Sequence, residues 1–191
     1  EKVLARFHKA TEKEISEAVI ASQKAWNEWS RFPWEDRVAI FLKAAELLSG
    51  PWRPILNGST MLNQSKTAYQ AEIDAACELA DFFRFNSLYL TRLYADQPES
   101  VKGLWNRVDY RPLEGFVFAV TPFNFTSIAG NLPSSPALMG NTVVWKPAST
   151  AVYSGYYIMK LFQEAGLPDG VINFLPGNGR EFGPVVLADP L

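Results

Sequence analysis

The sequence predicts an α/β fold in which a parallel sheet with helices on both faces follows an α-helical segment. Three short apolar segments rich in β-branched and aromatic residues, 116–120, 142–145 and 171–174, predict buried strands. Helical segments separate them, so the order strand–helix–strand repeats and the strands should run parallel. Residues before 104 show helical periodicity instead.

The segment before the sheet is expected to contain four helices. Thr11 and Glu14 have the spacing of a capping box, which predicts a helix start. Residues 3–7 have the composition of a short strand, or of the end of one. The expected helices span residues 12–29, 35–49, 52–63 and 68–94, and the second has Val38, Phe41, Leu42, Ala45 and Leu48 on its apolar face.

The fourth helix carries the only cysteine of the chain. Ile73, Cys77, Ala80 and Phe83 keep helical spacing and should face the core, which makes Cys77 a small buried hydrophobe. No basic neighbour that would activate the thiol is visible in the sequence. Asp74, Glu78 and Asp81 project from another face, and their spacing alone favours a solvated acidic stripe.

Residues 104–115 alternate moderately and end in a Pro-Leu-Glu-Gly turn. This pattern favours a β-hairpin that leaves the main body and returns. An extended linker with a turn explains the same residues equally well.

The predicted sheet region, 116–191, has a stop signal after each element. The first strand ends at Thr121-Pro122 and the second at Lys146-Pro147, because proline lacks the donor that a central strand needs. Between them a helix is expected over 131–139, with Pro133 near its start and Gly140 as its stop. A helix over 149–165, a strand over 171–175 and a helix over 180–188 should follow.

Two polar residues follow neighbouring strand ends, where open parallel sheets bind ligands. Asn124 follows the first strand and Lys146 the second, so both should face one crevice. A carboxamide can stabilise a developing oxyanion, and a lysine can bind ribose hydroxyls or phosphate. A turn-forming asparagine and a solvated lysine are the alternatives that position alone leaves open.

Several separated motifs together resemble the aldehyde dehydrogenase superfamily. TPFNF at 121–125 and NLPSSPALMGNTVVWKPAST at 131–150 are similar to its proline–aromatic–asparagine and lysine–proline motifs. The resemblance is strongest to the branch that acts on L-glutamate γ-semialdehyde, through QSKTAYQAEIDAACELADFFRFN at 64–86 and EAGLPDGVINFLPGNG at 164–179. It runs over nearly the whole chain and implies a Rossmann-like cofactor domain, here incomplete.

The resemblance implies roles for individual residues. Asn124 would stabilise the oxyanion of the thiohemiacetal, while Glu78 would bind the α-amino group of the substrate and Phe125 its aliphatic chain. NAD would be the cofactor, with NADP possible because neutral Ser149 neither repels a 2′-phosphate nor grips two hydroxyls strongly. The implied cofactor-binding residues are Thr121, Pro122, Phe123, Lys146, Ser149, Gly177 and Gly179, although the glycines lack the usual dinucleotide-binding spacing.

The resemblance also implies a cysteine nucleophile and a glutamate base, whose motifs do not occur in these 191 residues. We therefore expect an amino-terminal portion that is inactive alone, with domains 1–103, 104–115 (an assembly arm) and 116–191. A dehydrogenase for another aldehyde and a noncatalytic nucleotide-binding or assembly module are the alternatives. Homo-oligomers are expected, and the compartment is expected to be cytoplasmic, with the mitochondrial matrix as the alternative.

Composition narrows the possible partners. Apolar residues make up 48% and charged residues 20% of the chain, which is typical of globular proteins. The net charge of −2 argues against nucleic-acid binding, and no apolar run is long enough to span a membrane. One histidine and one cysteine leave no zinc-binding set and no internal disulfide.

Overall fold

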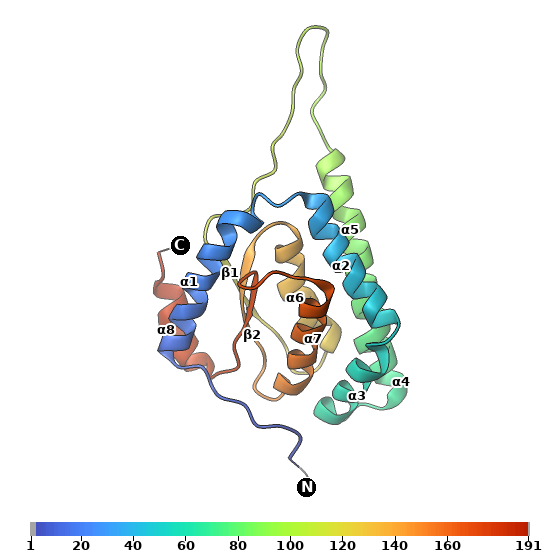
Figure 1. Ribbon diagram of the computed structural model, residues 1–191, viewed down its shortest axis with the longest axis vertical. Coiled ribbons are helices and arrows are strands. Elements are labelled where there is room, and N and C mark those ends of the chain that lie inside the picture. Colours follow the sequence, from blue (N-terminus) through green and yellow to red (C-terminus); the bar gives the residue numbers. More distant parts are fainter. Residues whose placement is uncertain (1–2, 191) are drawn as a thin grey trace.

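The computed structural model describes residues 3–190, which form a layered α/β body with one long projection (Figure 1). The segment before the sheet contains α1 (Glu12–Trp29), α2 (Trp34–Ser49), α3 (Arg53–Gln64), α4 (Ala68–Ala71), the π-helix η1 (Glu72–Glu78) and α5 (Leu79–Ala95). The sheet region contains β1 (Phe116–Val120), α6 (Thr126–Leu138), β2 (Thr142–Lys146), α7 (Val152–Ala165), β3 (Ile172–Phe174) and α8 (Gly179–Ala188).

The three strands form one parallel sheet in the order β1-β2-β3. Phe116 pairs with Thr142 and Val120 with Lys146, while Val143 pairs with Ile172. The predicted parallel α/β fold is therefore confirmed, and the carboxyl ends of β1 and β2 lie level with each other.

Helices cover both faces of the sheet (Figure 1). On one face, α1 and α8 pack against β1 and β2, and the rings of Phe118 and Phe182 stack 5.9 Å apart. On the other face, α6 and α7 lie against the sheet, and α2 and α5 cover them in turn. Phe41, Phe83 and Phe162 join α2, α5 and α7 through ring contacts of 5.7–6.1 Å.

The first helix has the bounds that the capping box predicts. The Thr11 backbone N–H donates to the Glu14 carboxylate at 2.8 Å. Hydrogen bonds from the Thr11 hydroxyl and backbone lower the pKa of Glu14. Local signals also placed α2, α3 and α8 within a residue of their observed bounds.

The predicted apolar face of the helix over 68–94 is wrong in its first half. The run is continuous, but η1 is wider than an α-helix and changes which side chains face inward. Ala80 and Phe83 are buried as expected, whereas Ile73 and Cys77 are exposed. Asp74 is 3% exposed, so it does not belong to a solvated stripe.

Four further predictions need correction. Residues 3–7 form no strand, and α6 begins at Thr126 rather than near residue 131, so that Pro133 lies inside it. The helix expected from residue 149 begins at Val152. On α2, Leu42 is exposed, whereas Arg37 is buried and donates from Nε to the Leu138 carbonyl at 2.9 Å.

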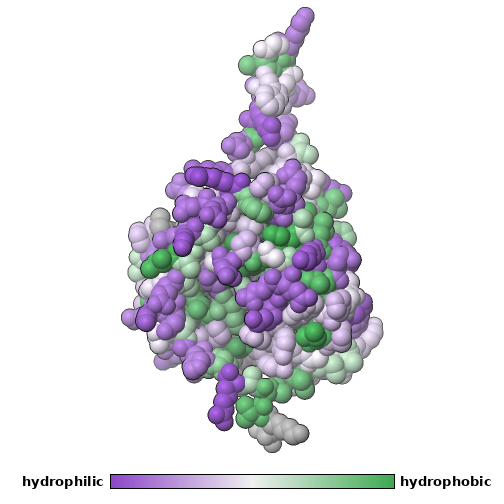
Figure 2. Space-filling view, viewed as in Figure 1, coloured by the Kyte–Doolittle hydropathy of each residue, from purple (hydrophilic) through white to green (hydrophobic). Residues whose placement is uncertain are grey.

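The projection consists of the chain between α5 and β1 (Figure 1), so residues 104–115 are its returning limb and do not form by themselves the β-hairpin that the sequence predicted. Its two limbs run alongside each other, although an isolated bridge between Val101 and Leu104 is the only β-pairing that the structure describes there. Gln97 instead joins the limbs, since its carboxamide oxygen accepts from the Val108 N–H at 2.8 Å. Figure 2 shows hydrophobic and hydrophilic surface on this projection, and Trp105 is 75% exposed.

No helix in residues 3–190 combines the length and apolar character needed to cross a bilayer.

Candidate functional site

The loops that follow β1 and β2 begin at the same edge of the sheet. The Thr121 N–H donates to the Lys146 carbonyl at 3.2 Å, which extends the pairing by one residue. The Thr121 hydroxyl is buried and accepts from Trp145 Nε1 at 2.9 Å. Residues 122–125 then lead toward α6, on the face of the sheet opposite α8.

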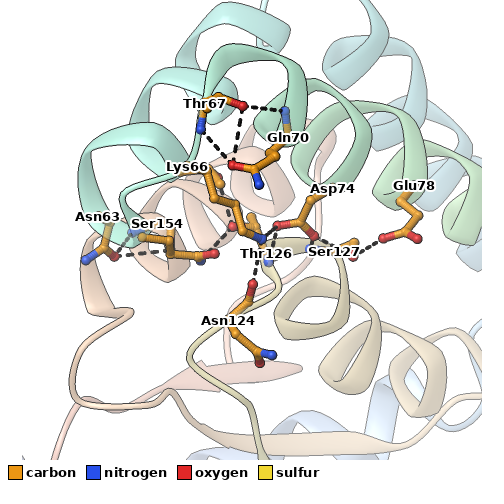
Figure 3. Close-up of polar contacts among 12 residues, drawn as sticks. Asn63, Lys66, Thr67, Gln70, Asp74, Glu78, Asn124, Thr126, Ser127 and Ser154 are labelled. Carbon is orange, nitrogen blue, oxygen red and sulfur yellow. Dashed lines mark hydrogen bonds and ion pairs between the residues drawn. The ribbon is translucent and has the colours of Figure 1, made fainter.

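Asn124 lies in this loop with its carboxamide free. Its backbone carbonyl accepts a hydrogen bond from Lys66 Nζ at 2.5 Å. The side chain extends away from Lys66 (Figure 3), and within the described part of the chain the carboxamide makes no hydrogen bond. An exposed amide on a fixed backbone is suited to donating to an oxyanion.

Asp74 holds the end of the same loop, where it enters α6. One carboxylate oxygen accepts from Lys66 Nζ at 2.6 Å and from the Thr126 N–H at 2.9 Å. The other accepts from the Ser127 N–H at 3.0 Å and from the Ser127 hydroxyl at 2.8 Å. This carboxylate therefore caps the first turn of α6, where backbone donors have no partner within the helix.

Ser127 connects Asp74 to Glu78. Its Oγ lies 2.8 Å from an oxygen of Asp74 and 2.7 Å from an oxygen of Glu78. A hydroxyl carries one proton, so it can donate to only one of the two carboxylates at a time. Glu78 is exposed, and its other oxygen is available to an external donor.

Phe125 lies next to the same network. The residue is 40% exposed, and Lys66 Nζ lies 4.5 Å from the ring centroid in a cation–π contact. The structure thus brings Glu78, at the end of η1, to the network that holds the neighbouring residues Asn124 and Phe125. All three are connected through Lys66 and Asp74.

The prediction that Asn124 and Lys146 face one crevice is wrong. Their loops begin at the same edge of the sheet, but the Lys146 side chain points to the α8 face, whereas the Asn124 loop leads toward α6 on the other face. Lys146 is 8% exposed, and Nζ donates to the Pro147 carbonyl at 3.1 Å, so it is not a solvated strand-end lysine. Its Cε lies 3.7 Å from the place where a Cβ of Gly179 would stand. Lys146 therefore lies beside the first turn of α8, whose Asn178 cap accepts from the Arg180 N–H at 3.1 Å.

The other predicted cofactor residues fall into different surroundings. Exposed Ser149 lines a hollow of about 650 Å³, together with Tyr153, Phe174 and Pro176. Gly177 is buried, and a Cβ there would stand 2.6 Å from a ring carbon of Phe182, so packing explains this glycine. In the loop after β1, Pro122 is half-buried and Phe123 is exposed.

Lys66, Asp74 and Ser127 were not predicted as site residues from the sequence. Asp74 was assigned to a solvated stripe, because the π-helix that turns it inward has no clear sequence signal. Lys66 and Ser127 lie 58 residues and 53 residues from their partners Asn124 and Asp74. No local pattern could have paired them.

The sequence model of the aldehyde dehydrogenase family matches residues 1–191. The chain belongs to the aldehyde dehydrogenase family. Among curated relatives, the Δ1-pyrroline-5-carboxylate dehydrogenase of Agaricus bisporus is 56% identical over 178 residues, which cover 93% of this chain and 33% of that protein. The mitochondrial enzyme of the same name from Homo sapiens is 50% identical over 183 residues, covering 96% of this chain and 32% of the relative.

Solved structures of this aldehyde dehydrogenase branch have the same fold. The Δ-pyrroline-5-carboxylate dehydrogenase of Mycobacterium tuberculosis, in a crystal structure with NAD, superposes with a TM-score of 0.95 at 54% identity. That match covers 96% of this chain and 34% of the solved chain. The chain thus spans about a third of the length of the relatives it matches.

Cys77 does not have the environment of an aldehyde dehydrogenase nucleophile. Partial desolvation by neighbouring groups and the Glu72 carboxylate raise the pKa of the exposed Cys77 thiol, although Arg53 Nη2 lies 3.7 Å from Sγ. Glu72 offsets this basic neighbour by pairing with Arg53. A nucleophilic cysteine needs a lowered pKa, so the surroundings of Cys77 disfavour its thiolate.

Proposed function

We propose that this chain forms the amino-terminal, cofactor-binding part of an NAD-dependent dehydrogenase that oxidises L-glutamate γ-semialdehyde to L-glutamate. Membership of the family and the names of its relatives support the reaction class and the substrate. One observation carries the proposal: the Asn124 carboxamide has no hydrogen bond in the described chain, while Lys66 holds the Asn124 backbone carbonyl in place.

Asn124 would act at the carbonyl carbon of the aldehyde. When a thiolate adds to this carbon, negative charge moves onto the aldehyde oxygen, and the carboxamide N–H donates to it. A rigid donor stabilises this charge more than that of the ground-state carbonyl. Such a donor contributes about a hundred- to a thousandfold in rate.

Glu78 and Phe125 would select the substrate. The exposed Glu78 carboxylate is a suitable partner for an α-ammonium group, and the exposed Phe125 ring offers apolar surface to the carbon chain. Both lie on the Asp74–Lys66 network with Asn124, so the ammonium and aldehyde ends of one small molecule can be held together.

The opposite face of the β1–β2 edge fits NAD, which accepts the hydride when bound. The buried ammonium group of Lys146 makes one hydrogen bond within the described chain, to the Pro147 carbonyl, and its other donors are available to a ligand. Beside Lys146, Gly179 has no side chain to cover the first turn of α8, where backbone N–H groups favour an anion. Ser149 would lie near the ribose, while Thr121, Pro122, Phe123 and Gly177 would offer backbone contacts. NADP use stays a prediction.

The remaining predictions concern assembly and location. We propose that the chain divides at residues 103 and 115, although the first boundary lies near the tip of the projection. The exposed projection, of which 104–115 is the returning limb, would contact other copies in a homo-oligomer. Several eukaryotic relatives are named as mitochondrial, which supports the matrix alternative more than the cytoplasm. An aldehyde is the proposed small-molecule partner.

The test uses a joined enzyme, in which this chain replaces the corresponding third of the M. tuberculosis relative. We expect it to form NADH from glutamate semialdehyde, and the 191-residue chain alone to form none. Asn124→Ala should lower kcat/KM about a hundred- to a thousandfold. Asn27→Ala, an exposed asparagine on α1, is the control and should change nothing.

Glu78→Gln separates this substrate from other aldehydes. It should raise KM for the semialdehyde and leave propanal, which has no ammonium group, unaffected; Asp81→Asn on the same helix is the control. Equal effects on both aldehydes would indicate another substrate. A joined enzyme that binds NAD but oxidises neither aldehyde would indicate a noncatalytic module.

A further inference from the structure

We propose that Lys66 and Asp74 are positioning residues, which together fix the peptide of Asn124 so that its carboxamide points at the reacting oxygen. This inference rests on the proposed function and adds two residues to it. Neither side chain extends toward the free carboxamide, so both act through the backbone (Figure 3).

Lys66 is placed to hold one particular peptide. Its ammonium group donates to the Asn124 carbonyl at 2.5 Å and to Asp74 at 2.6 Å, and it lies over the Phe125 ring. The side chain is only 16% exposed, so these contacts replace its hydration. An ammonium that is largely withdrawn from water is held firmly when its donors are paired in this way.

Asp74 fixes the chain immediately beyond that peptide. The N–H groups of Thr126 and Ser127 both point at its carboxylate, at 2.9 and 3.0 Å. The backbone is therefore held on both sides of Phe125, and Lys66 links the two anchors. The peptide of Asn124 cannot tilt without breaking a charge-assisted hydrogen bond.

The same carboxylate also reaches the substrate-binding group. Ser127 shares its single proton between Asp74 and Glu78, at 2.8 and 2.7 Å. An ammonium bound at Glu78 would satisfy that carboxylate, and the hydroxyl would then donate to Asp74 alone. Substrate binding thereby strengthens the anchor of the Asn124 loop.

A double-mutant cycle in the joined enzyme tests whether Lys66 acts through Asn124. Since a misplacement of about 1 Å can cost about a hundredfold in rate, we expect Lys66→Met to lower kcat/KM per active site about ten- to a hundredfold. In the Asn124→Ala background the same substitution should cost less than about twofold, because no carboxamide remains to be misplaced. Lys13→Met, which breaks a surface pair with Glu17, is the matched control and should change neither background.

Amide hydrogen exchange gives a readout that does not depend on turnover. Residues 124–127, which Lys66 and Asp74 anchor, should exchange faster in Lys66→Met than in Lys13→Met. Equal losses of kcat/KM in both backgrounds, or unchanged exchange, would overturn the proposal. If the unmutated joined enzyme oxidises no semialdehyde, the proposed function fails, and the exchange comparison still decides whether Lys66 fixes the loop.

Discussion

Replacing Asp74 by asparagine tests how much the buried carboxylate contributes to stability. The substitution keeps the size of the side chain but leaves one acceptor oxygen where four donors now point at two. Whichever way the amide turns, its NH₂ group faces either the ammonium of Lys66 or the N–H of a backbone group. Two donors thus lose their partner, and Lys66 keeps a largely buried charge.

The expected cost follows from these losses. Removing one partner of a buried ion pair costs about 3–5 kcal/mol, which agrees with two lost charge-assisted hydrogen bonds at about 1.5–3 kcal/mol each. With a urea m-value of about 2–3 kcal/mol/M, the unfolding midpoint of the chain should fall by about 1–2.5 M. Tryptophan fluorescence during urea unfolding measures it.

Asp81→Asn is the matched control, because Asp81 is exposed on the same helical run. It should change the free energy of unfolding by less than about 0.5 kcal/mol. The double variant Lys66→Met/Asp74→Asn should be more stable than Asp74→Asn alone, since it removes the unpaired charge. A midpoint for Asp74→Asn equal to that of Asp81→Asn would refute the reasoning.

Two further predictions concern stability elsewhere in the chain. Hydrogen bonds from Arg53 and Asn57 lower the pKa of Glu72 to about 2, so its ionised form stabilises the fold above its unfolded pKa, and that contribution is lost as the pH falls toward 2. Glu72→Gln should therefore destabilise the fold at pH 7 by less than about 1 kcal/mol, because the Arg53–Glu72 pair is part-exposed. The urea midpoints of the variant and the wild type should become equal as the pH approaches 2. A difference that does not change with pH would contradict this. Gly177→Ala should lower the thermal midpoint, at a cost of about 1–3 kcal/mol, because the Cβ would overlap a buried ring. In Gly183→Ala the added methyl meets nothing within 4 Å, so calorimetry should show a gain of up to about 1 kcal/mol; a loss there, or no loss at Gly177, would count against this account.

Elements with local signals could be predicted from the sequence. The capping box at Thr11 and Glu14 fixed the start of α1, because both partners lie within one turn. The strands over 116–120 and 142–146 followed from short apolar runs that end at proline. The parallel arrangement, and with it the common edge of the Asn124 and Lys146 loops, followed from chain connectivity.

Features that depend on distant residues could not be predicted in this way. The first turn of α6 is capped by Asp74, 52 residues earlier in the chain, so nothing near Thr126 marks the helix start. The π-helix exposes Cys77 and buries Asp74, against the 3.6-residue periodicity. The roles of Asn124 and Glu78 came from the family resemblance, whereas the network that connects them appears only in the structure.

The most direct test of the central claim is a crystal structure of the joined enzyme with NAD and L-glutamate. The account predicts the Asn124 carboxamide nitrogen about 2.7–3.1 Å from a γ-carboxylate oxygen of glutamate, with the α-ammonium group against Glu78. Lys146 should contact the adenosine ribose. Glutamate bound with its γ-carboxylate away from Asn124, or a dinucleotide that does not reach Lys146, would contradict the account.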